Sequence, residues 1–535
     1  MTRDSSWPIL QHISFQRPAV LDLCLCCIPW ALLASQDSKG APNRPKDDYL
    51  RQRTDLIIEE ISMKIGSDLR LSSAEEKINE MLMQYKSNEI SSAMTTNLFP
   101  PAMHFFHAKG LIENSQVYRM IKSMPKGGAL HLHDTSLVDA NWLIKNVTYR
   151  PHCYVCFNSN SGTQRMKFFK VAPSDPGLSN EALFNYKISL SIFSLYHNMT
   201  LVTSNPQQAY PNEATAWKVF DSRFSVITEL IMYKDVFQDY FYEALSEFYA
   251  DAVQFVEVRC LLAPLVYDLD GKLYDEDWMI QAYEDVNRKF VTDHPDFSGS
   301  QIIFSAIRSQ DKSDIASKVK QAVEFRQKYP DFVAGFDLVA WEQRGKPLID
   351  FLDDLLYPSQ LKPPVNLPYF FHAGETDWDG TSVDYNLYDA VLLNCSRIGH
   401  GYAVVKHPKI LKMLKEKDIP IEVNPISNQV LHLVDDLRNH PAAFLIANNY
   451  SIVVSSDDPG IWGSDPLSHD FYEIFMGSAG AKGDLRFLKQ LAINSIRYSS
   501  MLQEKKVAAY KLWTKKWMQW ITATLKQFGT YRYKL

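Results

Sequence analysis

Seven ionisable side chains that could bind a metal ion or transfer a proton lie at the carboxyl ends of short apolar runs in this sequence. They are His131, His133, His372, Glu375, His400, Asp457 and Asp458. A single histidine at the end of a strand is usually a core residue. Four histidines and three carboxylates at the same ends of separate strands instead predict an active site, because barrel enzymes place their chemistry at that face.

The segment His131-Leu132-His133 predicts a metal site. Side chains alternate along a strand, so both imidazoles lie on one side and can share one ion. With His372 and Asp457 the ion would have three nitrogen ligands and one oxygen ligand, a set that suits zinc best. The set leaves room for a water molecule, whose pKa zinc lowers toward about 7, so the site is predicted to be catalytic.

The remaining polar residues have predicted roles around this ion. Glu375 lies three residues beyond His372, close enough to reach a substrate, and we assign it proton donation. His400 is predicted to hold the attacking hydroxide and to stabilise its developing charge. Asp458 points differently from its neighbour Asp457 along an extended backbone, and it is therefore free to bind substrate.

Eight apolar, strand-like runs must position these side chains. They span residues 128–133, 255–260, 302–307, 333–338, 369–375, 397–401, 419–425 and 451–459. Nearly continuous apolar runs are typical of buried parallel strands, and amphipathic segments such as 315–329 supply the crossover helices. The sequence therefore predicts an α/β fold, a (β/α)8 TIM-type barrel within residues 126–535.

Two segments interrupt or precede the barrel pattern. Residues 35–125 are predicted to form a helical N-terminal domain, in which Ser72 and Ser73, followed by Glu75 and Glu76, indicate capping boxes. More than 120 residues separate the first two apolar runs, too many for one crossover. Residues from about 141 to 205 are therefore predicted to be a small inserted module.

Apolar residues at helical spacing among lysines mark the C-terminus, at Tyr510, Trp513, Trp517, Trp520, Ile521 and Leu525. We interpret this pattern as an amphipathic helix that packs against the barrel. A helix that binds a membrane surface or a calmodulin-like partner is the alternative.

Composition limits the partners of the chain. It has 535 residues, 46% of them hydrophobic and 22% charged, with a formal net charge of -6 and a pI of about 6.2. These values are typical of a folded, water-soluble protein. Acidic residues outnumber basic ones by 62 to 56 and no long Lys/Arg run occurs, so nucleic acid is not expected as a partner.

The N-terminus predicts secretion. Residues 19–34 are apolar but are interrupted by Asp22 and Pro29, and the stretch is too short to span a bilayer comfortably. We interpret residues 1–34 as a signal peptide, with an uncleaved anchor or a merely apolar terminus as alternatives. Four sequons for N-glycosylation support a secretory route, at Asn146, Asn198, Asn394 and Asn449.

Four cysteines remain after the predicted signal peptide, at Cys153, Cys156, Cys260 and Cys395. They are too few for a disulfide framework in a chain of this size. The Cys-x-x-Cys pair has no second pair to complete a zinc site. Bridging of this pair, locally or to another cysteine, free thiols and a metal all remain open.

The chain carries six motifs in a fixed order, MPKGGALHLHDTS, VAGFDL, FFHAGETDW, RIGHGYA, IEVNPISNQ and SSDDPG. Together they resemble those of the metal-dependent adenosine deaminases. The leader, the helical N-terminal segment and the long insert resemble more narrowly the secreted adenosine deaminase-related growth factors. The similarity covers nearly all of the chain after about residue 45.

This resemblance implies hydrolytic deamination of adenosine, and of 2′-deoxyadenosine, with release of ammonia and with one zinc ion per subunit. It implies that Glu375 protonates N1 of the purine and that His400 acts on the zinc-bound water. The implied zinc ligands are His131, His133, His372 and Asp457.

Further roles carried over from the family concern substrate binding. Asp458 would contact N7, Gly335 would contact N3, and Asp134 would contact the ribose. Trp217 begins a stretch, 217–224, that resembles the segment closing over the nucleoside; burial in the core is the alternative for this tryptophan. Relatives have a histidine before the arginine of the third strand, where this chain has Ile307, so that one substrate contact is not carried over.

The resemblance also implies partners and a location. It implies a homodimer formed through the helical N-terminal part, and contacts of the insert with a cell-surface receptor or glycan. The protein would be extracellular, with lysosomal delivery as an alternative, and its growth effect would follow from removal of adenosine. The competing functions are a receptor-binding growth factor with incidental catalysis and another barrel deaminase, acting on adenine, AMP or a pterin. A cytidine-type deaminase is excluded, because the chain lacks the HxE and PCxxC signatures.

Overall fold

The computed structural model describes residues 45–158, 164–171, 181–184, 192–263 and 265–529, and the predicted signal peptide lies outside these residues. The eight expected barrel strands are all found in the described part of the chain. They are β1 (Gly127–Ala129), β5 (Val253–Cys260), β8 (Gly299–Ile307), β9 (Val333–Val339), β10 (His372–Ala373), β11 (Ile398–His400), β12 (Ile421–Val423) and β13 (Ile452–Val454).

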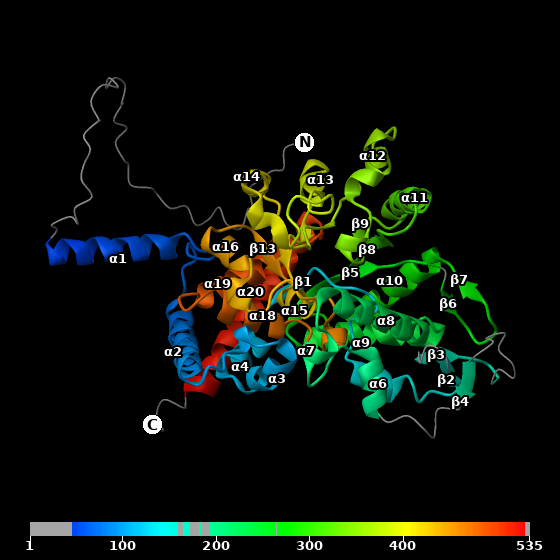
Figure 1. Cartoon of the computed structure of the whole chain (residues 1–535), viewed down its shortest axis with the longest axis horizontal. Helices are drawn as coiled ribbons and strands as arrows, with labels where there is room; N and C mark the ends of the chain where they lie inside the picture. Colours follow the sequence, from blue (N-terminus) through cyan, green and yellow to red (C-terminus); the bar gives the residue numbers. More distant parts are fainter. Residues whose placement is uncertain (1–44, 159–163, 172–180, 185–191, 264, 530–535) are drawn as a thin grey trace. The chain divides into compact units, whose positions relative to one another are not determined.

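These strands run parallel in two sheets, β1-β5-β8-β9 and β10-β11-β12-β13 (Figure 1). Two parallel bridges join the sheets into a closed barrel. One links Phe336 of β9 to Tyr369 and the other links Leu132 to Asp457. The predicted (β/α)8 barrel is confirmed, and Asp457 lies at one of the two seams.

The strands are apolar because helices cover their outer side. Every residue of β5 and β9 is buried. In the predicted crossover segment, Ile315, Val319, Ala322 and Val323 form the buried face of a helix. The helices that contact or follow the strands are α8 (Glu213–Ile231), α9 (Lys234–Ala250), α10 (Glu276–Asp293), α11 (Lys312–Lys328), α12 (Leu352–Gln360), α13 (Asn386–Leu392), α14 (Pro408–Lys417), α16 (Ala442–Ala447) and α19 (Leu485–Arg497).

Shorter elements fill the loops at the ends of the strands. Short α-helices are α7 (Pro206–Ala209), α15 (Pro425–Val430), α17 (Pro459–Trp462) and α18 (Ser468–Glu473). A two-stranded ribbon consists of β6 (Val266–Tyr267) and β7 (Leu273–Tyr274). The remaining turns are η1 (Pro100–Ala102), η3 (Glu342–Arg344), η4 (Leu348–Phe351), η5 (Tyr402–Lys406), η6 (Leu437–Asn439) and the π-helical η7 (Ile474–Ser478).

The N-terminal part is helical in the described residues, with α1 (Lys46–Ser62), α2 (Ser73–Thr96), α3 (Phe105–Asn114) and α4 (Gln116–Ser123). Ser72 caps α2 and exchanges hydrogen bonds with Glu75, which confirms one predicted capping box. The second predicted box is wrong, because Ser73 is already the first residue of the helix and a cap must precede it.

The C-terminal helix α20 (Gln503–Gly529) packs against α19 of the barrel, as expected, and also against α2 of the N-terminal part (Figure 1). Its tryptophans are anchored by their ring nitrogens. Trp513 Nε1 donates to the carbonyl of Pro125 at 3.0 Å, and Trp517 Nε1 donates to Glu75 Oε1 at 2.7 Å. These bonds show that α20 is packed into the folded protein. Among the described residues, no helix is both long and apolar enough to cross a membrane.

The predicted insert range contains a small antiparallel sheet of order β3-β2-β4. Its strands are β2 (Cys153–Asn158), β3 (Gln164–Phe168) and β4 (Glu181–Phe184), flanked by α5 (Ala140–Asn146) and α6 (Ile192–Met199). The limits of the insert and of the N-terminal domain stay predictions. Cys260 and Cys395 are buried free thiols, and the side chain of Cys156 lies outside the described residues.

One acidic residue of the core predicts how stability depends on pH. Glu473 is fully buried, and neither carboxylate oxygen has a partner among the described residues. Burial raises the pKa of Glu473 to about 8. In the unfolded chain its pKa returns to about 4.5, so between these values unfolding releases a proton and the free energy of unfolding falls as pH rises, by at most about 1.4 kcal/mol per pH unit.

We therefore expect Glu473→Gln to flatten the loss of stability between about pH 5 and about pH 8. Urea unfolding across this range measures the slope. Glu324→Gln, on the exposed side of α11, is the matched control and should keep the wild-type slope. An unchanged slope in Glu473→Gln would show that this residue is ionised in the folded protein.

Candidate active site

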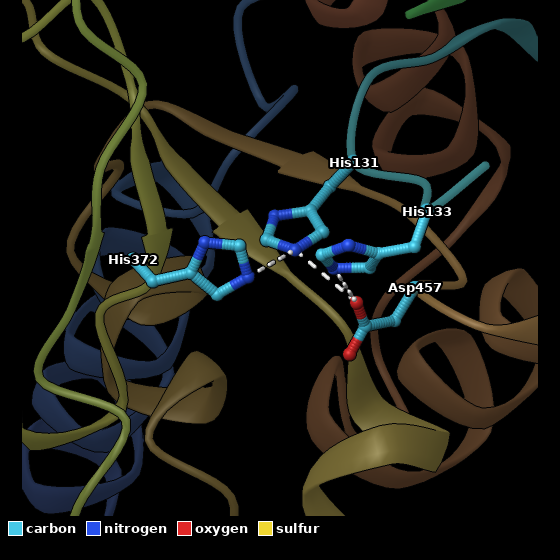
Figure 2. A group of neighbouring side chains, drawn as sticks. All are labelled: His131, His133, His372 and Asp457. Carbon is cyan, nitrogen blue, oxygen red and sulfur yellow. Dashed lines mark hydrogen bonds and ion pairs between the residues drawn. The ribbon is translucent and has the colours of Figure 1, made fainter. Parts of the chain in front are cut away.

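Four side chains converge at the carboxyl ends of the barrel strands, as Figure 2 shows. His131 and His133 follow β1, His372 begins β10, and Asp457 follows β13. His131 Nε2 lies 3.1 Å from His372 Nε2, and His133 Nε2 lies 3.0 Å from Asp457 Oδ1. One ligand atom from each residue lies within 4.8 Å of all the others, so the four predicted metal ligands are brought together.

The hydrogen bonds behind these ligands show that the cluster fits a cation. His131 Nδ1 is 2.7 Å from Glu422 Oε2, and His372 Nδ1 is 2.7 Å from Asp337 Oδ2. Because a carboxylate faces Nδ1 of both His131 and His372, each Nδ1 carries the proton and donates it to the carboxylate. The Nε2 atoms of the two rings, which face each other, therefore carry lone pairs. Asp457 Oδ1, also buried, accepts no hydrogen bond from a described residue. His131 Nε2, His372 Nε2 and Asp457 Oδ1 are thus three acceptor atoms, and none of them carries a proton to donate to the others. Such a group suits a metal ion, and a set rich in nitrogen suits zinc.

The local backbone explains how the imidazoles approach so closely. His131 and His133 lie on either side of Leu132, which forms the bridge to Asp457. Gly399 of β11 faces the ring of His131, and a Cβ on this glycine would come 3.0 Å from His131 Cε1. Gly399, the first glycine of the RIGHG run, therefore allows the close approach of His131, since a Cβ there would force the ring to shift.

Beneath the ligands lies a buried network of charges. Arg259 Nε lies 2.6 Å from Asp337 Oδ2, and Arg259 Nη2 lies 2.7 Å from Glu422 Oε2. Arg397 pairs with Glu422 and with Glu257. Burial would raise the pKa of Glu422, but Arg259 and Arg397 outweigh it and hold that pKa well below its usual value. The carboxylates that orient the two histidines are therefore ionised.

Glu375 has the properties of a proton donor. It is buried, and its backbone N–H donates to Glu342 Oε2 at 2.6 Å. Burial, together with the charges of Asp457 and Glu342, raises the pKa of Glu375 well above its usual value. The raised pKa favours the acid form of the side chain, which lies beside the ligand cluster.

His400 lies between Glu375 and Asp457. Its Nδ1 is 3.5 Å from Glu375 Oε1, and its Nε2 is 3.7 Å from Asp457 Oδ2. The residue has a φ of +59°, a conformation that non-glycine residues rarely adopt and that often marks functional sites. Burial lowers the pKa of His400 well below its usual value, so the imidazole is neutral.

Two predicted substrate carboxylates are also buried near the cluster. Asp458 accepts a short hydrogen bond from Ser136 Oγ, and burial and the charge of Asp457 raise its pKa well above the usual value. Burial raises the pKa of Asp134 to about 7, and Asp134 Oδ2 has no partner among the described residues. Both can therefore be protonated at neutral pH.

Gly335 and Trp217 occupy different surroundings from the ligand cluster. Gly335 lies within β9, where a Cβ would come 2.1 Å from the carbonyl oxygen of Pro368, so the close packing of the barrel wall by itself requires a glycine. Trp217 of α8 is buried and stacks on Trp341, with ring centroids 5.5 Å apart. A substrate contact by either residue stays a prediction.

A cavity of about 830 Å³ opens beside this stack, lined by Ala214, Thr215, Lys218, Asp221, Ser222, Ser225, Arg308, Ser309, Ala340, Trp341, Arg344 and Gly345. Arg308 connects it to the site, since its Nη2 donates to the carbonyl of His372 at 2.7 Å. Ile307 ends β8 directly before Arg308. This cavity thus adjoins the ligand cluster without being lined by it.

A second group of potential ligands, Asp379, Asp384 and His407, also lies within 4.8 Å. Here Asp384 Oδ1 is 2.9 Å from His407 Nε2, and Asp384 Oδ2 accepts from the backbone of Gly380. Both oxygens of the buried carboxylate are satisfied, so this group lacks the orphaned atom found at Asp457.

Comparisons with known proteins agree with the family resemblance found in the sequence motifs. The family model described as "Adenosine deaminase" matches residues 198–512, and "Adenosine/AMP deaminase N-terminal" matches residues 23–121. "Adenosine deaminase 2" of Homo sapiens is 48% identical over 476 residues, covering 88% of this chain and 92% of the relative. "Adenosine deaminase 2-A" of Danio rerio is 44% identical, covering 94% of this chain and 97% of the relative.

Solved structures share the fold at low identity. An amidohydrolase from Burkholderia ambifaria with bound Zn has a TM-score of 0.53 and 18% identity, covering 77% of this chain and 95% of the other. The Arabidopsis N6-mAMP deaminase has a TM-score of 0.52 and 17% identity, covering 74% of this chain and 99% of the other. At these identities the likeness concerns the barrel alone.

Proposed function

Because this chain belongs to the adenosine deaminase family and is a hydrolytic deaminase, we propose that it converts adenosine and 2′-deoxyadenosine to the corresponding inosines and ammonia. The observation that carries the proposal is the convergence of four ligand atoms within 4.8 Å near a buried carboxyl group, Glu375, whose pKa is raised by burial. A neutral acid beside a metal site suits addition of water to an aromatic amidine, which needs a proton on its ring nitrogen.

For the metal we propose one zinc ion per subunit, held by His131, His133, His372 and Asp457. When bound, the ion would supply a water nucleophile with a lowered pKa. The paired acceptors at His131 and His372, and the orphaned Asp457 Oδ1, support this assignment. The bound zinc of the Burkholderia ambifaria structure is a property of that protein.

The side chains of the protein carry out the proton transfer, the stabilisation of the attacking oxygen and the binding of the substrate. Glu375 delivers its proton to N1 as the water oxygen forms a bond to C6. Of the two protons of that water, one restores the acid form of Glu375 and the other passes to the amino group, so that ammonia leaves as the carbon–nitrogen bond breaks and C6 keeps a carbonyl oxygen. His400 orients and stabilises the attacking oxygen. Burial raises the pKa of Asp458 and so favours its acid form, which can donate to N7, an acceptor. Asp134 binds the ribose, Gly335 faces N3, and Trp217 closes over the nucleoside.

An ammonia-release assay tests this function directly. We expect turnover of adenosine, its loss on treatment with a chelator, and metal analysis showing one zinc per chain. AMP and adenine should be turned over at least about tenfold more slowly, because each changes contacts that the nucleoside site provides. Activity on AMP equal to or greater than that on adenosine would contradict the nucleoside assignment.

The setting of this reaction is a further part of the proposal. We place it outside the cell, with glycans at Asn146, Asn198, Asn394 and Asn449, and with growth effects that follow from adenosine removal. Asn146, Asn394 and Asn449 are exposed, which supports their modification. A homodimer through the helical N-terminal part is supported by exposed apolar side chains on α1, such as Leu56 and Ile58. The insert would contact a receptor or glycan.

A further inference from the structure

His400 is held at one ring nitrogen by a chain of three hydrogen bonds. Asn428 of α15 places its Nδ2 3.0 Å from His400 Nδ1. The other amide atom, Asn428 Oδ1, is 2.9 Å from His440 Nε2. His440 Nδ1 in turn is 3.0 Å from the backbone nitrogen of Ala442, at the start of α16. A backbone amide is thus connected to a side chain of the active site.

The donor and the acceptor of each of these three hydrogen bonds follow from the bond at Ala442. The Ala442 N–H can only donate, so His440 Nδ1 accepts. A neutral imidazole carries one proton, which must then be on His440 Nε2, and this N–H donates to Asn428 Oδ1. The amide therefore presents its NH2 group to His400 Nδ1, which accepts.

The flipped amide of Asn428 is excluded by the same reasoning. With oxygen and nitrogen exchanged, Asn428 would donate to His440 Nε2 while Ala442 donates to Nδ1. No neutral or protonated imidazole accepts at both nitrogens. His440 also stays neutral, because burial lowers its pKa to about 3. Asn428 and His440 are both buried, so bulk water does not compete for these bonds.

We propose that Asn428 and His440 are positioning residues that fix His400 in the tautomer with its proton on Nε2. This inference rests on the proposed function and adds to it a defined role for His400. The Nε2–H, 3.7 Å from Asp457 Oδ2, presents a donor where the attacking oxygen would lie. His400 can therefore stabilise that oxygen but cannot take a proton from it at Nε2.

The same tautomer suits the proton donor. The lone pair of His400 Nδ1 lies 3.5 Å from Glu375 Oε1. This lone pair already accepts from Asn428 Nδ2, but the partial negative charge of an unprotonated nitrogen still disfavours a carboxylate at Glu375, so the arrangement favours the acid form of Glu375.

Nitrogen-15 spectra of histidine-labelled, metal-free protein test the tautomer without any turnover. We expect His400, assigned by the signal missing from His400→Gln, to show the pattern of an imidazole protonated at Nε2. Asn428→Asp keeps an acceptor for His440 but can no longer donate, so His400 should change to the tautomer protonated at Nδ1. Wild-type protein protonated at Nδ1, or no change in Asn428→Asp, would overturn the proposal.

A pair of variants at His440 extends the test if Asn428→Asp does not fold. His440→Gln keeps an N–H for Asn428 Oδ1 and should keep the wild-type tautomer of His400. His440→Leu removes that donor and frees the amide to flip, so both tautomers of His400 should appear. Identical spectra from the two variants would show that His440 does not set the direction of the chain.

Kinetics separate this inference from the proposed function. We expect Asn428→Asp to lower kcat for adenosine about 100-fold, the cost of losing one positioned donor, and to change KM less than about threefold. Wild-type protein that fails to deaminate adenosine would refute the proposed function while leaving the spectral test valid. Wild-type activity with an undiminished kcat in Asn428→Asp would refute the positioning role alone.

Discussion

Glu375→Gln is expected to lower kcat for adenosine by about 100- to 10,000-fold, because the amide cannot deliver the proton that N1 requires. The substitution keeps the shape of the side chain, and the backbone N–H that donates to Glu342 is untouched. Binding of substrate and metal should therefore persist. Steady-state kinetics together with zinc analysis measure the effect.

The pH profile adds a second test of Glu375. A general acid works only while protonated, so wild-type activity should fall as pH rises through the raised pKa of Glu375. Residual activity of Glu375→Gln should lack this alkaline limb. Glu324→Gln on α11 is the control for a surface glutamate and should match the wild type. A fully active Glu375→Gln would contradict the catalytic assignment. An inactive Glu375→Gln that kept its full growth effect would contradict the link between catalysis and growth effects.

Asp457→Asn is expected to remove turnover by removing the metal. Asp457 supplies the only anionic ligand of the predicted set, and a neutral amide oxygen binds zinc far more weakly than a carboxylate. We expect zinc content to fall from about one per chain toward zero, with activity falling by at least the factor expected for Glu375→Gln.

Asp458→Asn provides the matched contrast, since it changes the neighbouring residue in the same way. Asp458 is bonded to Ser136 and is assigned to the substrate. The variant should retain its zinc and show impaired turnover with a raised KM, because its contact with the purine is altered. Loss of metal from Asp458→Asn, or a full complement in Asp457→Asn, would show that the ligand set is different.

Much of the architecture could be predicted from sequence because buried parallel strands are apolar throughout. All eight runs became strands, although β10 to β13 are regular over only two or three residues. The convergence of His131, His133, His372 and Asp457 followed from the rule that barrel strands end at one face. Two capping boxes were predicted for α2 because two serines precede two glutamates, and the geometry shows that only the Ser72–Glu75 box forms.

The network that orients the ligands was not found from sequence. Asp337, Glu422 and Arg259 each lie inside an apolar run, and a lone charge in a buried strand is a usable signal. Which charges meet depends on barrel closure, which brings Arg259 to Glu422 across 163 residues. The amide of Asn428 and the imidazole of His440 gave no sequence signal, because their pairing depends on the loops after β12.

The bridge between Leu132 and Asp457 joins the first strand of the barrel to the last. His131 precedes His372 by 241 residues, and Asp457 comes later still. A nascent chain therefore leaves the ribosome with two ligands long before the other two are synthesised. Neither half can form the proposed ligand set alone, so an ion held by all four residues could bind only once the last strand has docked beside the first.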